Sequence, residues 1–184
     1  MRRTAGEGGI SYAYGLISAD AKVIQKYFND QKLASSSVTA SVIYTDQDYK
    51  QDQNAPVTYT VHEMITVQTS NVDKVDALSR AIGPLNDQVS GGSVVTVQPP
   101  EYYVSTLPAL RVSLIGQAIA DAKARANEIA KSGGSTIGKL QSASSGVVQV
   151  LAPNSTNVED YGSYDTSTIQ KQVMVTARAT FSVN

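Results

Sequence analysis

The stretch QKQVMVTARATFSV, Gln170–Val183, is the clearest structural signal in this 184-residue sequence. Apolar and polar side chains alternate along it, and a period of two is typical of a strand with one buried face, most often in an antiparallel sheet. Lys171 alone interrupts the apolar series. The residues expected to face the core are Ile169, Val173, Val175, Ala177, Ala179, Phe181 and Val183.

A long helix is expected upstream of this strand, at about Pro108–Lys131. Proline suits the first helical turn, and the pair Gly133-Gly134 suits the end of the helix. Leu and Ala recur along it at helical spacing, which predicts an apolar stripe that packs closely on a sheet. A strand at about Gln141–Leu151 and a long polar loop, residues 153–168, link the helix to the last strand.

The N-terminal half of the chain contains the same kinds of element. The pattern predicts strands at Ile10–Leu16, Val38–Tyr44, Val57–Val67 and Ser93–Gln98, helices at Ser18–Gln31 and from Ser70 to Leu85, and a polar hairpin loop at 45–56. The resulting order, β-α-β-β-α-β-α-β-β, indicates an α+β fold with a largely antiparallel sheet and helices packed on one face. We expect one domain over residues 10–184, preceded at residues 1–9 by a disordered or artificially added segment.

Composition excludes several classes of protein. Charged residues make up 17% of the chain and the formal net charge is -1, so no basic surface for nucleic acid is expected. The absence of Cys removes disulfides, thiolate zinc sites and thiol nucleophiles. No apolar run approaches the ~18 residues of a membrane span, and the start MRRTAGEGG is not an intact signal peptide. Membrane contact is therefore expected only through a leader or anchor that this chain does not contain.

His62 is the only histidine, and we expect it on the polar face of its strand. With no Cys and no second His, the sequence offers neither a histidine-rich metal site nor a Cys-His pair. A Ser-His-Asp arrangement stays open because Ser and Asp are plentiful, although no serine has the surroundings of a nucleophile elbow. We therefore predict no catalytic and no metal-binding residues, with a cryptic hydrolase that uses His62 as the alternative.

The segment GGSTIGKL, Gly133–Leu140, matches part of a phosphate-binding loop. Leu140, however, stands where such a loop needs Ser or Thr to hold magnesium. The order of elements is also reversed, because these glycines close a helix, and the dipole at a helix C-terminus repels phosphate. We interpret the segment as a helix cap and expect no nucleotide or other cofactor.

Two further sequence patterns are weaker indications of a binding site. Asp46, Asp48 and Asp52 faintly resemble a calcium loop, but the glycine and the final glutamate of such a loop are missing, so a solvated hairpin loop is expected. The pair Tyr102-Tyr103 precedes the long helix, and we interpret it as packing rather than as a base-stacking platform, since a basic groove is absent from the sequence pattern.

The block Tyr102–Val150 combines a Tyr-ended strand, a Leu-rich lead-in, an Ala-rich helix and a Gly-x-x-x-Gly-Lys turn. An alternating strand follows after a variable polar loop. In this order the features resemble the SIMPL domain family, whose bacterial members include periplasmic and outer-membrane-associated immunogenic proteins. The earlier elements fit in order too, so the likeness spans nearly all the chain beyond about Ile10. The residues that carry it are Ala118, Ala122, Ala126, Gly134, Gly138 and Lys139.

The resemblance implies an exported envelope domain, periplasmic or surface-exposed, with a loose link to stress tolerance. Some relatives look like building blocks of large homo-oligomers, and the family has no established catalytic residues to carry over. We therefore expect a non-enzymatic domain that works by homo-oligomerisation or by binding an envelope protein. We expect self-association through a sheet edge, for which the nearly uncharged strand Gln170–Val183 is the candidate, or through the polar face of the sheet, where Gln172, Met174, Thr176 and Thr180 are neutral. An intracellular signalling adaptor, the role from which the family takes its name, is a third hypothesis.

Overall fold

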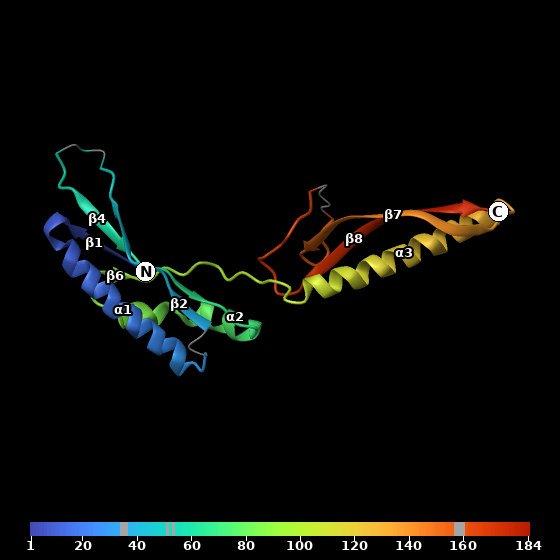
Figure 1. Cartoon of the computed structure of the whole chain (residues 1–184). Coiled ribbons are helices and arrows are strands. Elements are labelled where there is room, and N and C mark those ends of the chain that lie inside the picture. The colour runs from blue at the N-terminus through green and yellow to red at the C-terminus, as the bar shows by residue number, and fades with distance from the viewer. Residues whose placement is uncertain (34–36, 51, 53, 157–160) are drawn as a thin grey trace. The chain divides into compact units, whose positions relative to one another are not determined.

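The computed structural model describes residues 1–33, 37–50, 52, 54–156 and 161–184, and Figure 1 labels its elements. The described chain forms two compact units, Met1–Pro100 and Glu101–Asn184, whereas the sequence predicted one domain over residues 10–184. The strands pair antiparallel within both units, and together with the helices they form the predicted α+β fold. The sequence of element types matches the predicted one, but the first strand is Arg2–Gly6 and not Ile10–Leu16, and two of the later strands are each divided in two.

The first unit is built on a sheet with the strand order β3-β4-β1-β6. Its strands are β1 (Arg2–Gly6), β3 (Tyr44–Gln47), β4 (Thr58–His62) and β6 (Ser93–Val94). β1 is an inner strand, because all of its residues pair with β4 on one side and its first two pair with β6 on the other. The expectation that residues 1–9 are disordered is therefore wrong. Pairing of backbone groups holds this segment in the sheet although its side chains show little apolar pattern.

The strand expected at Ile10–Leu16 is also wrong, because these residues open helix α1 (Ile10–Asp30). The apolar side chains that α1 buries recur three or four residues apart, at Ala13, Ile17, Ala21, Ile24 and Phe28. Tyr12, which contributed to the apparent alternation, is 71% exposed. The helix expected at Ser18–Gln31 is confirmed and begins earlier than its pattern suggested.

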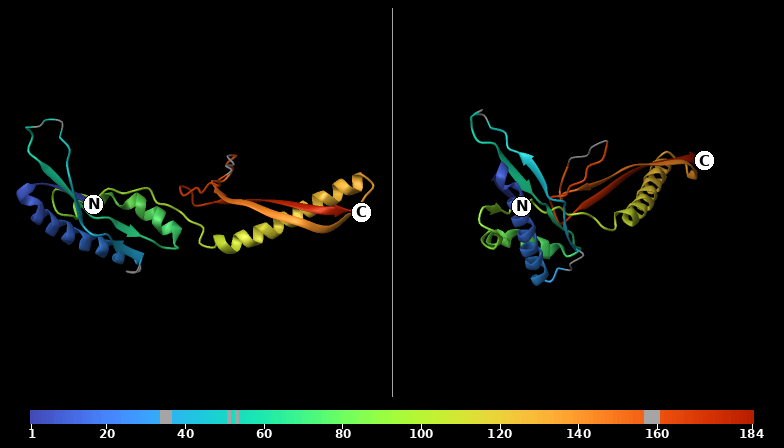
Figure 2. Two further views of the ribbon diagram at one scale, coloured as in Figure 1. Left: turned by 45° about the horizontal axis from the view of Figure 1, so that its top comes forward. Right: turned by 60° about the vertical axis from the view of Figure 1, so that its left-hand side comes forward.

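Helix α1 packs on β1 and β4, as the ribbon views in Figure 2 show, and its side chains contribute to two apolar clusters. The residues of these clusters are Ala13, Ile17 and Val61 in one, and Ile24, Phe28, Leu33, Leu85 and Val89 in the other. Asp20 lies on the same helix and is only 2% exposed. Its Oδ1 accepts hydrogen bonds from the backbone N and the hydroxyl of Ser90, each 2.8 Å long, so this carboxylate ties the loop before β6 to α1.

The long hairpin of the first unit is interrupted in both arms. β2 (Val38–Ala40) pairs with β5 (Ile65–Val67), while β3 pairs with β4. Glu63 stands at the interruption between β4 and β5, where it is 7% exposed, and burial raises the pKa of its carboxyl. The continuous strands expected at Val38–Tyr44 and Val57–Val67 are therefore each split, the first after Ala40 and the second after His62.

Helix α2 (Val72–Ala81) and a 3-10 turn (Gly83–Asp87) complete the first unit. The side chain of Asn71 caps α2 by accepting a 3.1 Å hydrogen bond from the backbone N of Lys74. The helix expected from Ser70 thus begins two residues later, at Val72. β6 is shorter than the strand expected at Ser93–Gln98.

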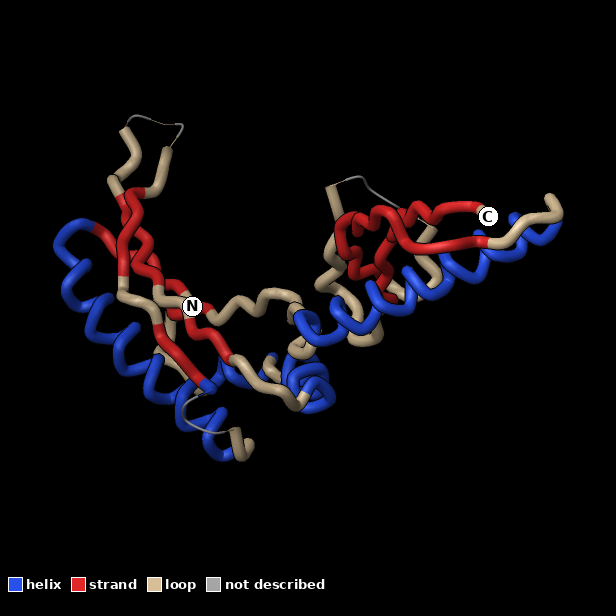
Figure 3. The backbone as a smooth tube through the Cα atoms, turned by 45° about the vertical axis from the view of Figure 1, so that its right-hand side comes forward, coloured by secondary structure: helices blue, strands red, loops and turns tan. Residues whose placement is uncertain are grey.

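The second unit is a helix lying along a two-stranded ribbon, as Figures 1 and 3 show. The helix is α3 (Leu107–Ser132), and the ribbon consists of β7 (Ile137–Leu151) and β8 (Gln172–Val183). The alternation predicted for the last strand is confirmed over most of its length. Its helix-facing residues Val173, Val175, Ala177, Ala179 and Phe181 are half-buried, whereas Gln172, Thr176, Arg178 and Thr180 are exposed.

The end of α3 is a helix cap built by two glycines. Gly133 has an ordinary φ of -92°, and Gly134 has a φ of +74°, in the left-handed region that favours glycine. The backbone N of Ser135 donates to Ala130 O (2.9 Å), and that of Gly134 donates to Lys131 O (3.0 Å). These are the two hydrogen bonds of a Schellman motif, so the capping interpretation of GGSTIGKL is confirmed.

The loop before β8 is held by a buried ion pair that explains the interruption of the alternating pattern. Lys171 lies just outside β8, with a side chain only 6% exposed, and its Nζ is 2.7 Å from Asp165 Oδ2. Asp165 also accepts hydrogen bonds from both the backbone and the hydroxyl of Ser167 and Thr168. Together with Lys171, which contributes most, these donors hold the pKa of Asp165 well below its usual range.

Candidate functional site

The structure places His62 beside two residues of the neighbouring strand. Its Nε2 is 3.5 Å from Asp46 Oδ2, and its ring stacks on Tyr44 with 5.0 Å between the ring centres and 12° between the planes. The contact follows from the register, which pairs Tyr44 with His62 directly across β3 and β4. This contact supplies the His and the Asp of a Ser-His-Asp arrangement, but not its Ser. Sequence reasoning missed both partners, because only the register of the hairpin identifies them.

The three aspartates of the weak calcium pattern do not converge. Asp46 faces His62, while the two oxygens of Asp48 accept hydrogen bonds from the hydroxyls of Thr58 and Thr60, each 2.7 Å long. These bonds, that from Thr60 first, lower the pKa of Asp48. Asp52 accepts a hydrogen bond from the backbone N of Asn54 in a local turn. Among the residues that the structure describes, no group of three or more His, Cys, Asp or Glu is arranged to hold a metal ion.

The segment GGSTIGKL does not have the geometry of a phosphate-binding loop in the structure. Gly133 and Gly134 close α3, and Lys139 lies beyond them on β7, with its side chain exposed. The backbone N–H groups at this position satisfy carbonyls of the last helical turn. They are therefore not free to surround a phosphate as those at a helix N-terminus are.

Tyr102 and Tyr103 have different surroundings. Tyr102 is 7% exposed, and its backbone N donates a 2.8 Å hydrogen bond to Thr166 O, so it packs as expected. Tyr103 is 65% exposed, and its hydroxyl donates a 2.5 Å hydrogen bond to Glu101, which raises the pKa of the phenol. Its ring lies 5.8 Å from that of Tyr164 in the loop before β8.

The most unusual surface of the described chain is the ribbon of the second unit. Every residue of β7 from Lys139 to Val147 is exposed, and Ala130 is the one residue that α3 buries. Cross-strand neighbours share a face, so Leu140, opposite Phe181, points to the side that carries α3, yet it is 49% exposed. α3 packs mainly against β8 and therefore leaves this side of β7 open.

Apolar side chains gather around this incomplete cover. A hollow of about 300 Å³ opens between the end of α3 and the ribbon, and Ile129 and Val183 at its margin are 74% and 66% exposed. Val112 on α3 and Val147 on β7 are 72% and 42% exposed, but they do not line this hollow. A hollow with exposed apolar side chains at its margin marks an interaction surface more often than isolated exposed residues do.

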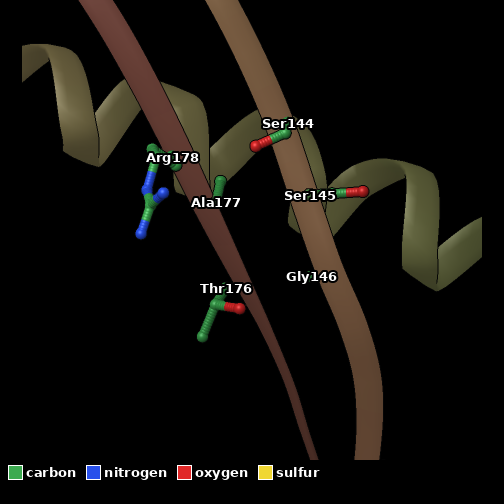
Figure 4. Close-up of a pocket in the computed structure, with 6 residues that line it drawn as sticks. All are labelled: Ser144, Ser145, Gly146, Thr176, Ala177 and Arg178. Atoms are coloured by element: carbon green, nitrogen blue, oxygen red, sulfur yellow. The ribbon is translucent and has the colours of Figure 1, made fainter. Parts of the chain in front are cut away.

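A second hollow, also of about 300 Å³, lies where β7 bulges against β8 (Figure 4). The pairing shifts between Ser145 and Val148, and Gly146 sits in the shift. A Cβ at Gly146 would stand 2.3 Å from the hydroxyl oxygen of Thr176, so any larger residue would force that side chain to move. The lining is polar and carries one charge, Arg178, which makes it a shallow surface feature rather than an enclosed substrate pocket.

The sequence matches the model of the SIMPL family, described as proteins of unknown function (DUF541), over residues 11–183. The chain belongs to the SIMPL family. The resemblance seen in the block Tyr102–Val150 is thus confirmed, and the family match extends across both structural units. No curated protein matches this SIMPL chain in sequence. No helix within the described residues is both long and apolar enough to cross a membrane.

Proposed function

We propose that this SIMPL chain is a non-enzymatic domain of the cell envelope, periplasmic or surface-exposed, that works by homo-oligomerisation or by binding another envelope protein. The observation that carries the proposal is the incomplete second unit, in which one helix half-covers a two-stranded ribbon. A two-stranded ribbon needs either further strands or a packed helix to be stable in water, and α3 supplies that packing mainly on β8. Association through the open side of β7 adds strands to this sheet and covers the exposed apolar side chains.

The balance of buried and exposed apolar residues supports association through the second unit. Its buried apolar residues, among those described, are Tyr102, Ala130, Val150 and Leu151. Its large apolar residues that remain exposed are Tyr103, Val112, Ile129, Leu140, Val147, Tyr161, Tyr164, Ile169 and Val183. Each square ångström of apolar surface removed from water contributes about 25 cal/mol, so covering even a few of these side chains favours a complex.

An envelope location is the part of the proposal that rests on composition and family. The chain has few charged residues and is rich in Ser, Thr, Gln and Asn. Fractionation of the source cells with an antibody to the native protein tests this location and any link to stress. Recovery in the cytosol would contradict an envelope role and favour the intracellular adaptor.

The mass of the purified native protein in solution tests self-association directly. Light scattering coupled to size exclusion, at micromolar concentrations, is expected to give a mass of two or more times the 19.5 kDa of one chain. A monomer mass at every concentration would remove homo-oligomerisation and leave heterologous partner binding as the role of the ribbon.

The hydrolase alternative rests on the His62–Asp46 contact. The hydroxyls of nearby Thr58 and Thr60 are engaged by Asp48, on the same hairpin. We therefore expect an ester panel to show no turnover that depends on His62. Hydrolysis that disappears in His62→Ala, with an unchanged unfolding curve, would establish the alternative instead.

A further inference from the structure

The outer edge of β7 is open over most of its length. β8 pairs with one side of this strand, and on the other side the segment 163–165 occupies the C-terminal end. There Val150 N donates to Ser163 O (2.8 Å), and Asp165 N donates to Val150 O (2.7 Å). From Lys139 to Val147, no strand within the described part of the chain pairs with this edge.

This open edge lacks charge and proline, two of the features that keep edge strands from pairing, although its pairing with β8 shifts at three places. From Leu140 to Leu151 the sequence contains no charged residue and no proline. Charged side chains and prolines are the usual protection of a free edge, because an open row of N–H and C=O groups is a template for another strand. β8, the edge expected from sequence, carries Arg178 near its middle and has α3 packed mainly against it. The structure thus makes β7, rather than β8, the candidate edge for pairing with another strand.

We propose that the β7 edge pairs antiparallel with β7 of a second copy of the chain, across a two-fold axis that passes between Ser142 and Ser144. The inference rests on the proposed homo-oligomerisation and identifies its interface. The two ribbons become one sheet with the order β8-β7-β7-β8, and both α3 helices lie on the same face. The paired sheet has four strands, within the range of about 4–6 that is commonest in globular proteins.

The chemistry of the edge favours a second copy as its occupant. A two-fold axis brings each residue near its own equivalent, so a self-pairing strand must avoid charge at its centre. The middle of the free edge is Ala143, flanked by Ser142 and Ser144, and these small neutral side chains meet that condition. With Ala143 on the axis, Lys139 lies opposite Val147 of the partner subunit, and no lysine faces a lysine.

The pairing also uses the exposed apolar residues of β7. With the same centre, Leu140 lies opposite the partner's Gly146, where no side chain competes for space. Leu140 is 49% exposed in the single chain and is brought between the two helices on the paired sheet. An uncharged edge with an apolar margin has nothing to attract a strongly charged partner, which argues against an acidic or basic peptide as its occupant.

Cysteine scanning tests the interface, because the chain has no Cys of its own. Residues directly opposite each other in an antiparallel pair have Cβ atoms about 4.5–5.5 Å apart, close to the separation in a disulfide. We expect Ala143→Cys, which lies opposite its own equivalent, to form a disulfide-linked dimer in the highest yield under mild oxidation, with lower yields for Ser142→Cys and Ser144→Cys on either side of the axis. Arg178→Cys and Thr180→Cys are matched controls, because these residues lie opposite Ser144 and Ser142 on β8.

A pair of lysine variants provides a second readout that needs no oxidation. Ser142→Lys places two like charges next to the two-fold axis and is expected to weaken association roughly tenfold in light scattering. Thr180→Lys adds the same charge to the same face of the ribbon, but on β8, and is expected to leave association within about twofold of the original.

The outcomes of these two experiments distinguish the proposed β7 interface from homo-oligomerisation in general. Strong cross-linking on β7 with little on β8 supports the proposal. An oligomer whose β7 variants neither cross-link nor weaken, or whose β8 variants cross-link equally, overturns this interface but leaves homo-oligomerisation standing. A monomer at all concentrations without cross-links overturns both.

Discussion

Replacing Gly134 by Ala tests the cap of α3 through backbone conformation alone. Gly134 has a φ of +74°, and a Cβ built on it meets no atom within 4 Å. The substitution therefore adds no clash, and its effect comes from holding an L-residue in the left-handed region, at about 1–2 kcal/mol. Part of this is offset by the reduced freedom of the unfolded chain, about 0.4–1 kcal/mol. We expect a net loss of about 1 kcal/mol in the free energy of unfolding.

Gly133→Ala is the matched control. Gly133 has a φ of -92°, and its Cβ would lie 3.5 Å from Ala130 O, an ordinary contact. We expect this variant to be neutral or slightly more stable, because it too restricts the unfolded chain. Gly134→Asn should lose less than Gly134→Ala, since Asn tolerates the left-handed region.

Urea unfolding followed by far-UV circular dichroism measures both variants, with tyrosine fluorescence as a second signal because the chain has no Trp. With a slope of about 1–3 kcal/mol per molar urea, 1 kcal/mol moves the midpoint by roughly 0.3–1 M. If the two units unfold separately, the shift belongs to the transition of the unit that contains α3. Equal losses in Gly133→Ala and Gly134→Ala would refute the argument, and so would an unchanged midpoint for Gly134→Ala.

Four further predictions follow from the described contacts. Phe181→Ala should lower the free energy of unfolding by about 1–3 kcal/mol, less than a fully buried ring would lose, whereas Thr180→Ala on the exposed face should change it by under about 0.5 kcal/mol in the same urea melts. Because the folded state lowers the pKa of Asp165, its contribution is present above the unfolded pKa of about 4 and is lost as pH falls below that value; Asp165→Asn should flatten the loss of stability measured between about pH 5 and pH 2, and an unchanged pH profile would contradict this. Isothermal titration should detect no ATP binding, and micromolar binding abolished by Lys139→Ala would reverse the interpretation of GGSTIGKL. His62→Ala should leave any background ester hydrolysis unchanged, since the described partners of His62 are an aspartate and a tyrosine ring.

The exposed ribbon and the family match both make association the first property of this protein to test. The SIMPL family carries no assigned activity in its description, so the geometry of this chain is the best guide to its role. Both units expose large apolar residues, but in Glu101–Asn184 they outnumber the buried ones and accompany the open, uncharged edge of β7.

Several elements were determined by local sequence alone. The alternation along Gln172–Val183 identified β8 and its two faces, because a period of two is a property of the strand backbone. Leu107–Ser132 and its double-glycine cap were equally readable, since a helix end needs a residue that accepts positive φ. The SIMPL resemblance depended on these same two features and was confirmed by the family match.

Other features were decided only by tertiary structure. Arg2–Gly6 has no apolar pattern and became an inner strand because two neighbouring strands offered backbone partners. Ile10–Leu16 alternated like a strand, yet burial at Ala13 and Ile17 against the sheet selected the helix. The His62–Asp46 contact depended on hairpin register, and the open edge of β7 on where the segment 163–165 ends. Pairing and burial between distant segments are set by the whole fold, and no local period of the sequence encodes them.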